Sequence, residues 1–155
     1  MAEYATSIEI DAPPDVVFEH LVVPERMVAW MGQHAELDPR SDGTFSVDIN
    51  GSPVRGRYLE VDRPRRVVVS WGVAGSDAHP PGSSQVEFTL VPVGGGTRLD
   101  LRHTGLPDEQ APGYAEGWQH FAARLQVTAA GGDAGPDPWA DRWRSDATTT
   151  RDRAE

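Results

Sequence analysis

One stripe of large side chains dominates the segment from Leu99 to Gln126. Its members recur at the spacing of one α-helical face, at Tyr114, Trp118, Phe121 and Leu125. Three aromatic rings on one helix need a broad apolar surface opposite them, because each ring buries on the order of 150–250 Å². The segment therefore predicts a strand, a turn at residues 105–107 and a long helix that packs against a sheet.

Seven segments alternate between apolar and polar positions, which predicts strands with one buried face. They lie at residues 4–10, 34–38, 44–49, 54–62, 66–71, 85–90 and 98–103. Asn50-Gly51 is a strong hairpin signal, and short turns make neighbouring strands antiparallel. Two short helices are expected early, at residues 14–23 and 24–31, each beginning with a proline.

These elements predict an α+β fold in which the last helix covers the apolar face of a sheet of six to seven strands. We expect one domain at residues 1–130 and a polar tail at 131–155. The tail contains Trp139 and Trp143 four residues apart, a spacing that favours a short helix. These two tryptophans should dock on the domain or on a partner. The stretch 72–83 is expected to be a flexible polar loop outside the core.

Composition narrows the function classes. The chain has 155 residues, a formal net charge of −10 and no cysteine. The negative charge argues against nucleic acid or an anionic membrane as the main partner. The absence of cysteine excludes disulfides and a thiol nucleophile. No signal peptide and no long apolar run is evident, so we expect a cytoplasmic protein without membrane insertion.

Three stretches carry a resemblance to a known family: IDAPPDVVFEHLVVPERMVAWM, GRYLEVDRPRRVVVSW and LRHTGLPDEQAPGYAEGW. Over residues 4–128 the chain resembles the START-like (SRPBCC) superfamily, and within it the family of the activator of Hsp90 ATPase, whose domains are also described as polyketide-cyclase-like. The resemblance implies a helix-grip fold, in which a curved antiparallel sheet wraps around a long C-terminal helix. It also implies a cavity between sheet and helix for a small hydrophobic or amphipathic molecule.

Eight residues are the candidate ligand-binding positions, because strand alternation and the helical stripe point them inward. Tyr58 and His103 would orient the polar end of a ligand. The alternative at each position is a solid core that leaves no cavity. The eight candidates are Trp30, Phe45, Tyr58, Trp71, Phe88, His103, Trp118 and Phe121.

Two other functions remain open. A cyclase, dehydratase or hydrolase would use His103 with Tyr58 or Glu60 to move protons in a dry pocket. We assign no catalytic residue, since no nucleophile elbow is evident. A chaperone-associated or stress-response interaction module, or a homodimer, would use the tryptophans of the tail.

The sequence also predicts the surroundings of four histidines and one glycine. His34, with two acidic neighbours on one strand face, does not make a metal site, and we expect neither metal nor cofactor. His20 and His79 are expected to be exposed, and His120 should point away from the aromatic stripe. Gly117 inside the helix suggests close approach by the sheet or a ligand, because glycine costs roughly 1 kcal/mol there relative to alanine.

Overall fold

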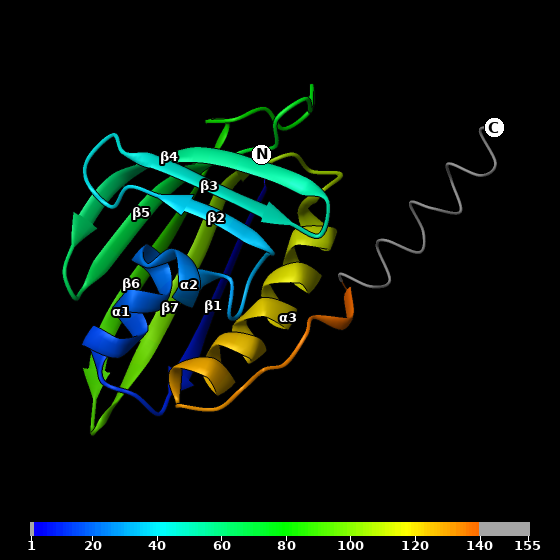
Figure 1. Ribbon diagram of the computed structural model, residues 1–155. Coiled ribbons are helices and arrows are strands. Elements are labelled where there is room, and N and C mark those ends of the chain that lie inside the picture. The colour runs from blue at the N-terminus through cyan, green and yellow to red at the C-terminus, as the bar shows by residue number, and fades with distance from the viewer. Residues whose placement is uncertain (1, 140–155) are drawn as a thin grey trace.

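A computed structural model describes residues 2–139. Within these residues one antiparallel sheet of seven strands packs against three helices, in the strand order β1-β7-β6-β5-β4-β3-β2 (Figure 1). This arrangement confirms the predicted helix-grip fold. The elements are β1 (Ala2–Ile10), α1 (Pro14–Val22), α2 (Pro24–Met27), β2 (His34–Leu37), β3 (Thr44–Ile49), β4 (Ser52–Asp62), β5 (Arg66–Trp71), β6 (Ser84–Val93), β7 (Gly96–Leu106) and α3 (Ala111–Ala129).

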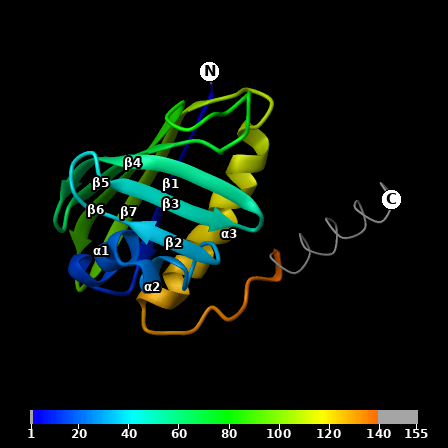
Figure 2. The same cartoon turned by 45° about the horizontal axis from the view of Figure 1, so that its top comes forward.

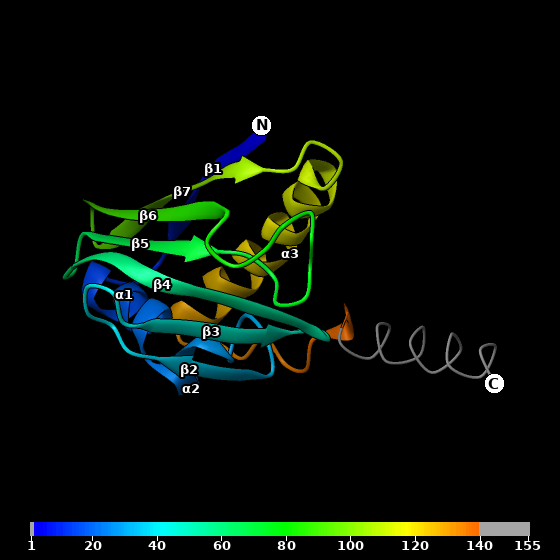
Figure 3. The same cartoon turned by 90° about the horizontal axis from the view of Figure 1, so that it is seen from above.

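Strand β4 of the curved sheet changes its pairing partner in its middle. Its residues 52–57 pair with β3, and residues 58–62 pair with β5. A Cβ atom at Gly56 would overlap with the carbonyl oxygen of Ser70, so this crossing requires glycine. The curvature brings β2 and β3 around the side of α3, as the view from above shows (Figure 3).

The pairing of β4 with β5 shifts register between Tyr58 and Glu60. Tyr58 points inward and is fully buried, whereas Glu60 lies on the outer face, 3.2 Å from the Nε of Arg66. Strict alternation along residues 54–62 predicts both side chains on one face, and that prediction is wrong. A bulge inserts one extra residue and reverses the alternation that the sequence pattern assumes.

The two early helices close one end of the curved sheet (Figure 2). α2 ends at Met27, four residues before the predicted end. Two core side chains hold α1 in place through its carbonyl groups. The Tyr58 hydroxyl donates to the Leu21 carbonyl at 2.9 Å, and the Trp30 indole donates to the His20 carbonyl at 3.0 Å. His20 is buried, contrary to our expectation, because the helix turns it toward the core.

The loop between β5 and β6 also differs from the prediction. Residues 72–83 reach toward the N-terminal end of α3 (Figure 3). His79 in this loop is completely buried, and its carbonyl accepts the amide of Val73 at 2.8 Å. The expectation of an exposed His79 was wrong because the loop turns this side chain inward, whereas most other residues of the loop are exposed.

The segment after α3 runs back along that helix (Figure 1). Arg124 donates to the carbonyl groups of Ala134 and Gly135 at 3.3 and 2.8 Å. Trp139 stacks on His120, with ring centroids 3.9 Å apart and an interplanar angle of 4°. Trp139 thus docks on its own domain, while Trp143 lies outside the described residues. In the part of the chain described, no helix combines the length and apolar character needed to cross a membrane.

Candidate functional site: a cavity between the sheet and helix α3

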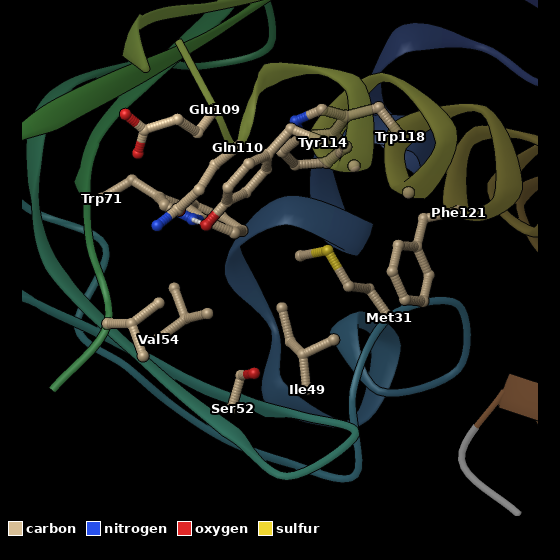
Figure 4. A pocket seen from close by; sticks show the side chains of 13 residues that line it. Met31, Ile49, Ser52, Val54, Trp71, Glu109, Gln110, Tyr114, Trp118 and Phe121 are labelled. Atoms are coloured by element: carbon tan, nitrogen blue, oxygen red, sulfur yellow. Dashed lines mark hydrogen bonds between the residues drawn. The ribbon is translucent and has the colours of Figure 1, made fainter. Parts of the chain in front are cut away.

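A cavity of about 420 Å³ lies between α3 and the inner face of β3, β4 and β5 (Figure 4). Its volume falls in the range of small-molecule pockets. Apolar side chains form most of its walls, and a few polar groups lie near the start of α3. The lining residues are Met31, Ile49, Ser52, Val54, Trp71, Val73, Glu109, Gln110, Gly113, Tyr114, Gly117, Trp118 and Phe121.

Two glycines of α3 leave room for the cavity. Gly113 and Gly117 lie four residues apart and therefore on the same side of the helix. A Cβ atom built at either position would have no neighbouring heavy atom within 4 Å. Of the two alternatives expected for Gly117, close approach by the sheet is wrong because that glycine borders open space, and approach by a ligand stays a prediction.

The cavity lining is almost uncharged. Among the described residues that line it, Glu109 alone carries a formal charge. Polar atoms come from Ser52, Gln110 and Tyr114, together with the indole N–H of Trp71. A ligand carboxylate or phosphate would find no cation in this lining and would be repelled by Glu109. The walls therefore favour an uncharged, largely apolar molecule.

Three of the eight candidate residues line the cavity: Trp71, Trp118 and Phe121. The other five lie in the packed core behind it: Trp30, Phe45, Tyr58, Phe88 and His103. Met31 lines the cavity instead of its neighbour Trp30, whose indole is bonded to helix α1. The pattern of inward positions does not distinguish a side chain that faces a cavity from one that another side chain covers.

His103 lies on the side of Trp118 away from the cavity and accepts its indole hydrogen bond. The Trp118 indole N–H donates to Nδ1 of His103 at 3.1 Å, and Nε2 of His103 lies 2.8 Å from the Ser84 hydroxyl. Burial, and to a lesser degree the neighbouring His79, lower the pKa of His103 to about 3. The ring is therefore neutral at pH 7 with both nitrogens occupied. Glu60 lies on the opposite face of the sheet, so the structure does not bring Glu60 and His103 together as an acid–base pair.

A second histidine, which sequence analysis placed outside the core, connects the cavity to this cluster. Nδ1 of His79 lies 3.1 Å from the Tyr114 hydroxyl, and its Nε2 lies 2.7 Å from the Ser84 hydroxyl. The Trp71 indole donates to the Tyr114 oxygen at 3.2 Å. Tyr114 therefore carries the hydroxyl that the network presents at the cavity wall (Figure 4).

Burial keeps both members of this pair uncharged. It raises the pKa of Tyr114, partly offset by the hydrogen bond from Trp71. It lowers the pKa of His79, partly offset by a hydrogen bond with the side chain of Gln110. A neutral phenol and a neutral imidazole at pH 7 suit hydrogen bonding to an uncharged ligand. Among residues 2–139, no group of three His, Cys, Asp or Glu side chains is placed to hold a metal ion.

The curved sheet, the long C-terminal helix and the cavity between them define a helix-grip protein of the START-like class. Residues 11–130 match the family described as "Activator of Hsp90 ATPase homolog 1-like protein", and the chain belongs to that family. An uncharacterized protein of Schizosaccharomyces pombe is 26% identical over 107 residues, which cover 68% of this chain. The match spans only 30% of the length of that curated relative.

Solved structures agree with this assignment. An AHSA1-like protein of Rhizobium etli is 43% identical, with a TM-score of 0.72 over 88% of this chain and 87% of that one. CalU16 of Micromonospora echinospora is 28% identical, with a TM-score of 0.69 over 93% of this chain and 82% of that one. The Aha1 dimer of Colwellia psychrerythraea shares the fold, with a TM-score of 0.74 at 17% identity over 85% of this chain and 98% of that one.

Proposed function

We propose that the protein binds one small, uncharged and largely apolar molecule in the cavity beneath α3. The observation that carries this proposal is a cavity of about 420 Å³ bordered by Gly113 and Gly117 of α3, which have no side chains to fill it. A packed core would place side chains there, because interiors hold few voids larger than a water molecule. Apolar walls with a few convergent polar groups are typical of ligand sites.

The shape of the lining favours a flat ring system. The rings of Trp71 and Trp118 lie 5.3 Å apart by centroid, and Tyr114 and Phe121 line the same cavity. Aromatic side chains attract planar ligands through offset-stacked and edge-to-face contacts. The lining of described residues offers no cation, which disfavours fatty acids and phosphorylated ligands.

A matched pair of dyes tests the proposal. N-phenyl-1-naphthylamine is uncharged, and 8-anilinonaphthalene-1-sulfonate carries the same rings with an added anion. We expect the uncharged dye to bind at one site with enhanced fluorescence, and the sulfonate to bind at least tenfold more weakly.

Two variants of α3 locate the binding site. Gly117→Leu should abolish binding, because the new side chain occupies the cavity. Ala123→Leu adds the same side chain at an exposed position of the same helix and should leave binding unchanged. No binding by the uncharged dye, or undiminished binding by folded Gly117→Leu protein, would contradict the proposal.

A further inference from the structure

Six side chains form a continuous hydrogen-bonded network behind the polar end of the cavity, here called the Ser84 network. It connects the loop 72–83, strands β5, β6 and β7, and helix α3. Its members are Trp71, His79, Ser84, His103, Tyr114 and Trp118.

The direction of the bonds is fixed at one end of the network. An indole N–H can only donate, so Nδ1 of His103 accepts from Trp118 and the ring proton of His103 is on Nε2. That N–H donates to the hydroxyl oxygen of Ser84 at 2.8 Å. His103 therefore has a single possible tautomer.

His79 has two possible tautomers. With the proton on Nε2, His79 donates to Ser84, whose hydroxyl donates to the Trp71 carbonyl at 3.0 Å. The Tyr114 hydroxyl then donates to Nδ1 of His79 at 3.1 Å. In this arrangement every polar hydrogen of the network has an acceptor within the protein, and Tyr114 offers the cavity only a lone pair.

The other tautomer reverses these bonds. With the proton on Nδ1, His79 donates to the Tyr114 oxygen, and the Ser84 hydroxyl turns to donate to Nε2 of His79. The hydroxyl proton of Tyr114 is then free to donate into the cavity. The His79 ring is uncharged in both tautomers, because the proton lost from Nε2 and the one gained at Nδ1 are exchanged with water.

We propose that Tyr114 and His79 form a polar anchor whose hydrogen-bonding direction adapts to the ligand, so that the cavity takes aromatic ketones and aromatic alcohols alike. This inference rests on the proposed ligand-binding function. A ligand hydroxyl donates to Tyr114 when the His79 proton is on Nε2. A ligand carbonyl accepts from Tyr114 when that proton is on Nδ1.

Three naphthalenes with one substituent pattern test the anchor. They are 2-acetylnaphthalene, 1-(2-naphthyl)ethanol and 2-ethylnaphthalene, which place a carbonyl, a hydroxyl and a methylene on the same ring. We expect the ketone and the alcohol to bind about five- to tenfold more tightly than the ethyl compound, as one additional hydrogen bond predicts.

Nitrogen NMR of the labelled histidine rings reads the tautomers directly. We expect the ketone to move the His79 proton from Nε2 to Nδ1, and the alcohol to leave it on Nε2. His103 is the internal reference and should keep its proton on Nε2 throughout. A bound ketone that leaves the His79 tautomer unchanged would overturn the adaptable anchor.

Two tyrosine variants distinguish a hydroxyl that binds the ligand from a hydroxyl that only stabilises the fold. Tyr114→Phe should bring the ketone and the alcohol down to the affinity of the ethyl compound. Tyr58→Phe removes a buried hydroxyl that bonds Leu21 away from the cavity, and should preserve the order of affinities. If Tyr114→Phe preserves that order, the anchor is refuted while ligand binding stands. If none of the three compounds binds the wild-type protein, both the anchor and the proposed function fail.

Discussion

The indole of Trp118 on α3 donates to Nδ1 of His103 on β7 at 3.1 Å. This bond attaches the helix to the sheet and fixes the orientation of an indole that lines the cavity. It also fixes the tautomer of His103, whose other nitrogen then bonds Ser84. The wall of the cavity is thus held from behind by a buried polar network.

A double-mutant cycle measures this bond. Trp118→Phe leaves Nδ1 of His103 buried without a donor, which costs about 1–3 kcal/mol, in addition to the lost indole packing. His103→Leu should cost about 1 kcal/mol less in the Trp118→Phe background than in the wild type. Urea unfolding of the four proteins gives the coupling free energy. Strictly additive losses would show that the bond does not stabilise the fold.

The free energy of unfolding should fall as the pH drops from about 6.5 to 4.5. Burial lowers the pKa of His20, His79 and His103 in the folded protein, so each binds its proton more readily when unfolded. Their contribution is complete above pH 6.5 and decreases below it by up to about 1.4 kcal/mol per pH unit for each histidine. Urea titrations at pH 7, 6 and 5 measure the slope. Equal stability at pH 7 and pH 5 would contradict the buried neutral state of these rings.

Alanine at the two cavity glycines should stabilise the protein and weaken ligand binding together. Gly113→Ala and Gly117→Ala each add a methyl group into open space and improve helix propensity by about 1 kcal/mol. Thermal unfolding and titration with N-phenyl-1-naphthylamine test the two effects on the same samples. A loss of stability in both variants would mean that the sheet packs against these glycines after all.

The segment that follows α3 should loosen when Asp137 is removed. One Asp137 carboxylate oxygen is 2.8 Å from Nε2 of His120 and accepts the backbone N–H of Trp139 at 2.9 Å. Asp137→Ala should therefore speed hydrogen exchange of the Trp139 amide at least tenfold. Asp133→Ala is the control, because that exposed carboxylate accepts the Gly135 amide in the same segment, whereas the bonds of the Trp139 amide and of His120 go to Asp137. Equal exchange of the Trp139 amide in both variants would show that Asp137 does not hold the segment.

Periodicity in the sequence was enough to predict an α+β fold with the last helix packed on a sheet, and the family resemblance added the helix-grip arrangement. The helical stripe through Trp118 and Phe121 and the alternation in each strand identified the elements to within a few residues. The bulge after Tyr58 escaped prediction, because an inserted residue reverses strand parity without changing composition. This is why Glu60 was placed on the wrong face.

The cavity was harder to predict than the fold. Inward parity alone placed Phe45 and Phe88 in the cavity lining together with Trp71, although both phenylalanines are buried in the core and do not line the cavity. Two glycines at helical spacing, Gly113 and Gly117, were the available signal, because such a pair leaves one helix face bare. His79 carried no such signal, since its burial depends on how a loop of polar composition folds back.

The central claim is that a ligand occupies the space between α3 and the sheet, and mapping a bound molecule by NMR tests it most directly. N-phenyl-1-naphthylamine should shift the backbone amides of Gly113 and Gly117 in a saturable, one-to-one manner. Amides on the outer face of β6 and β7, around Glu87 and Arg102, should not respond. Shifts confined to that outer face, or no saturable shifts at either glycine, would contradict the account.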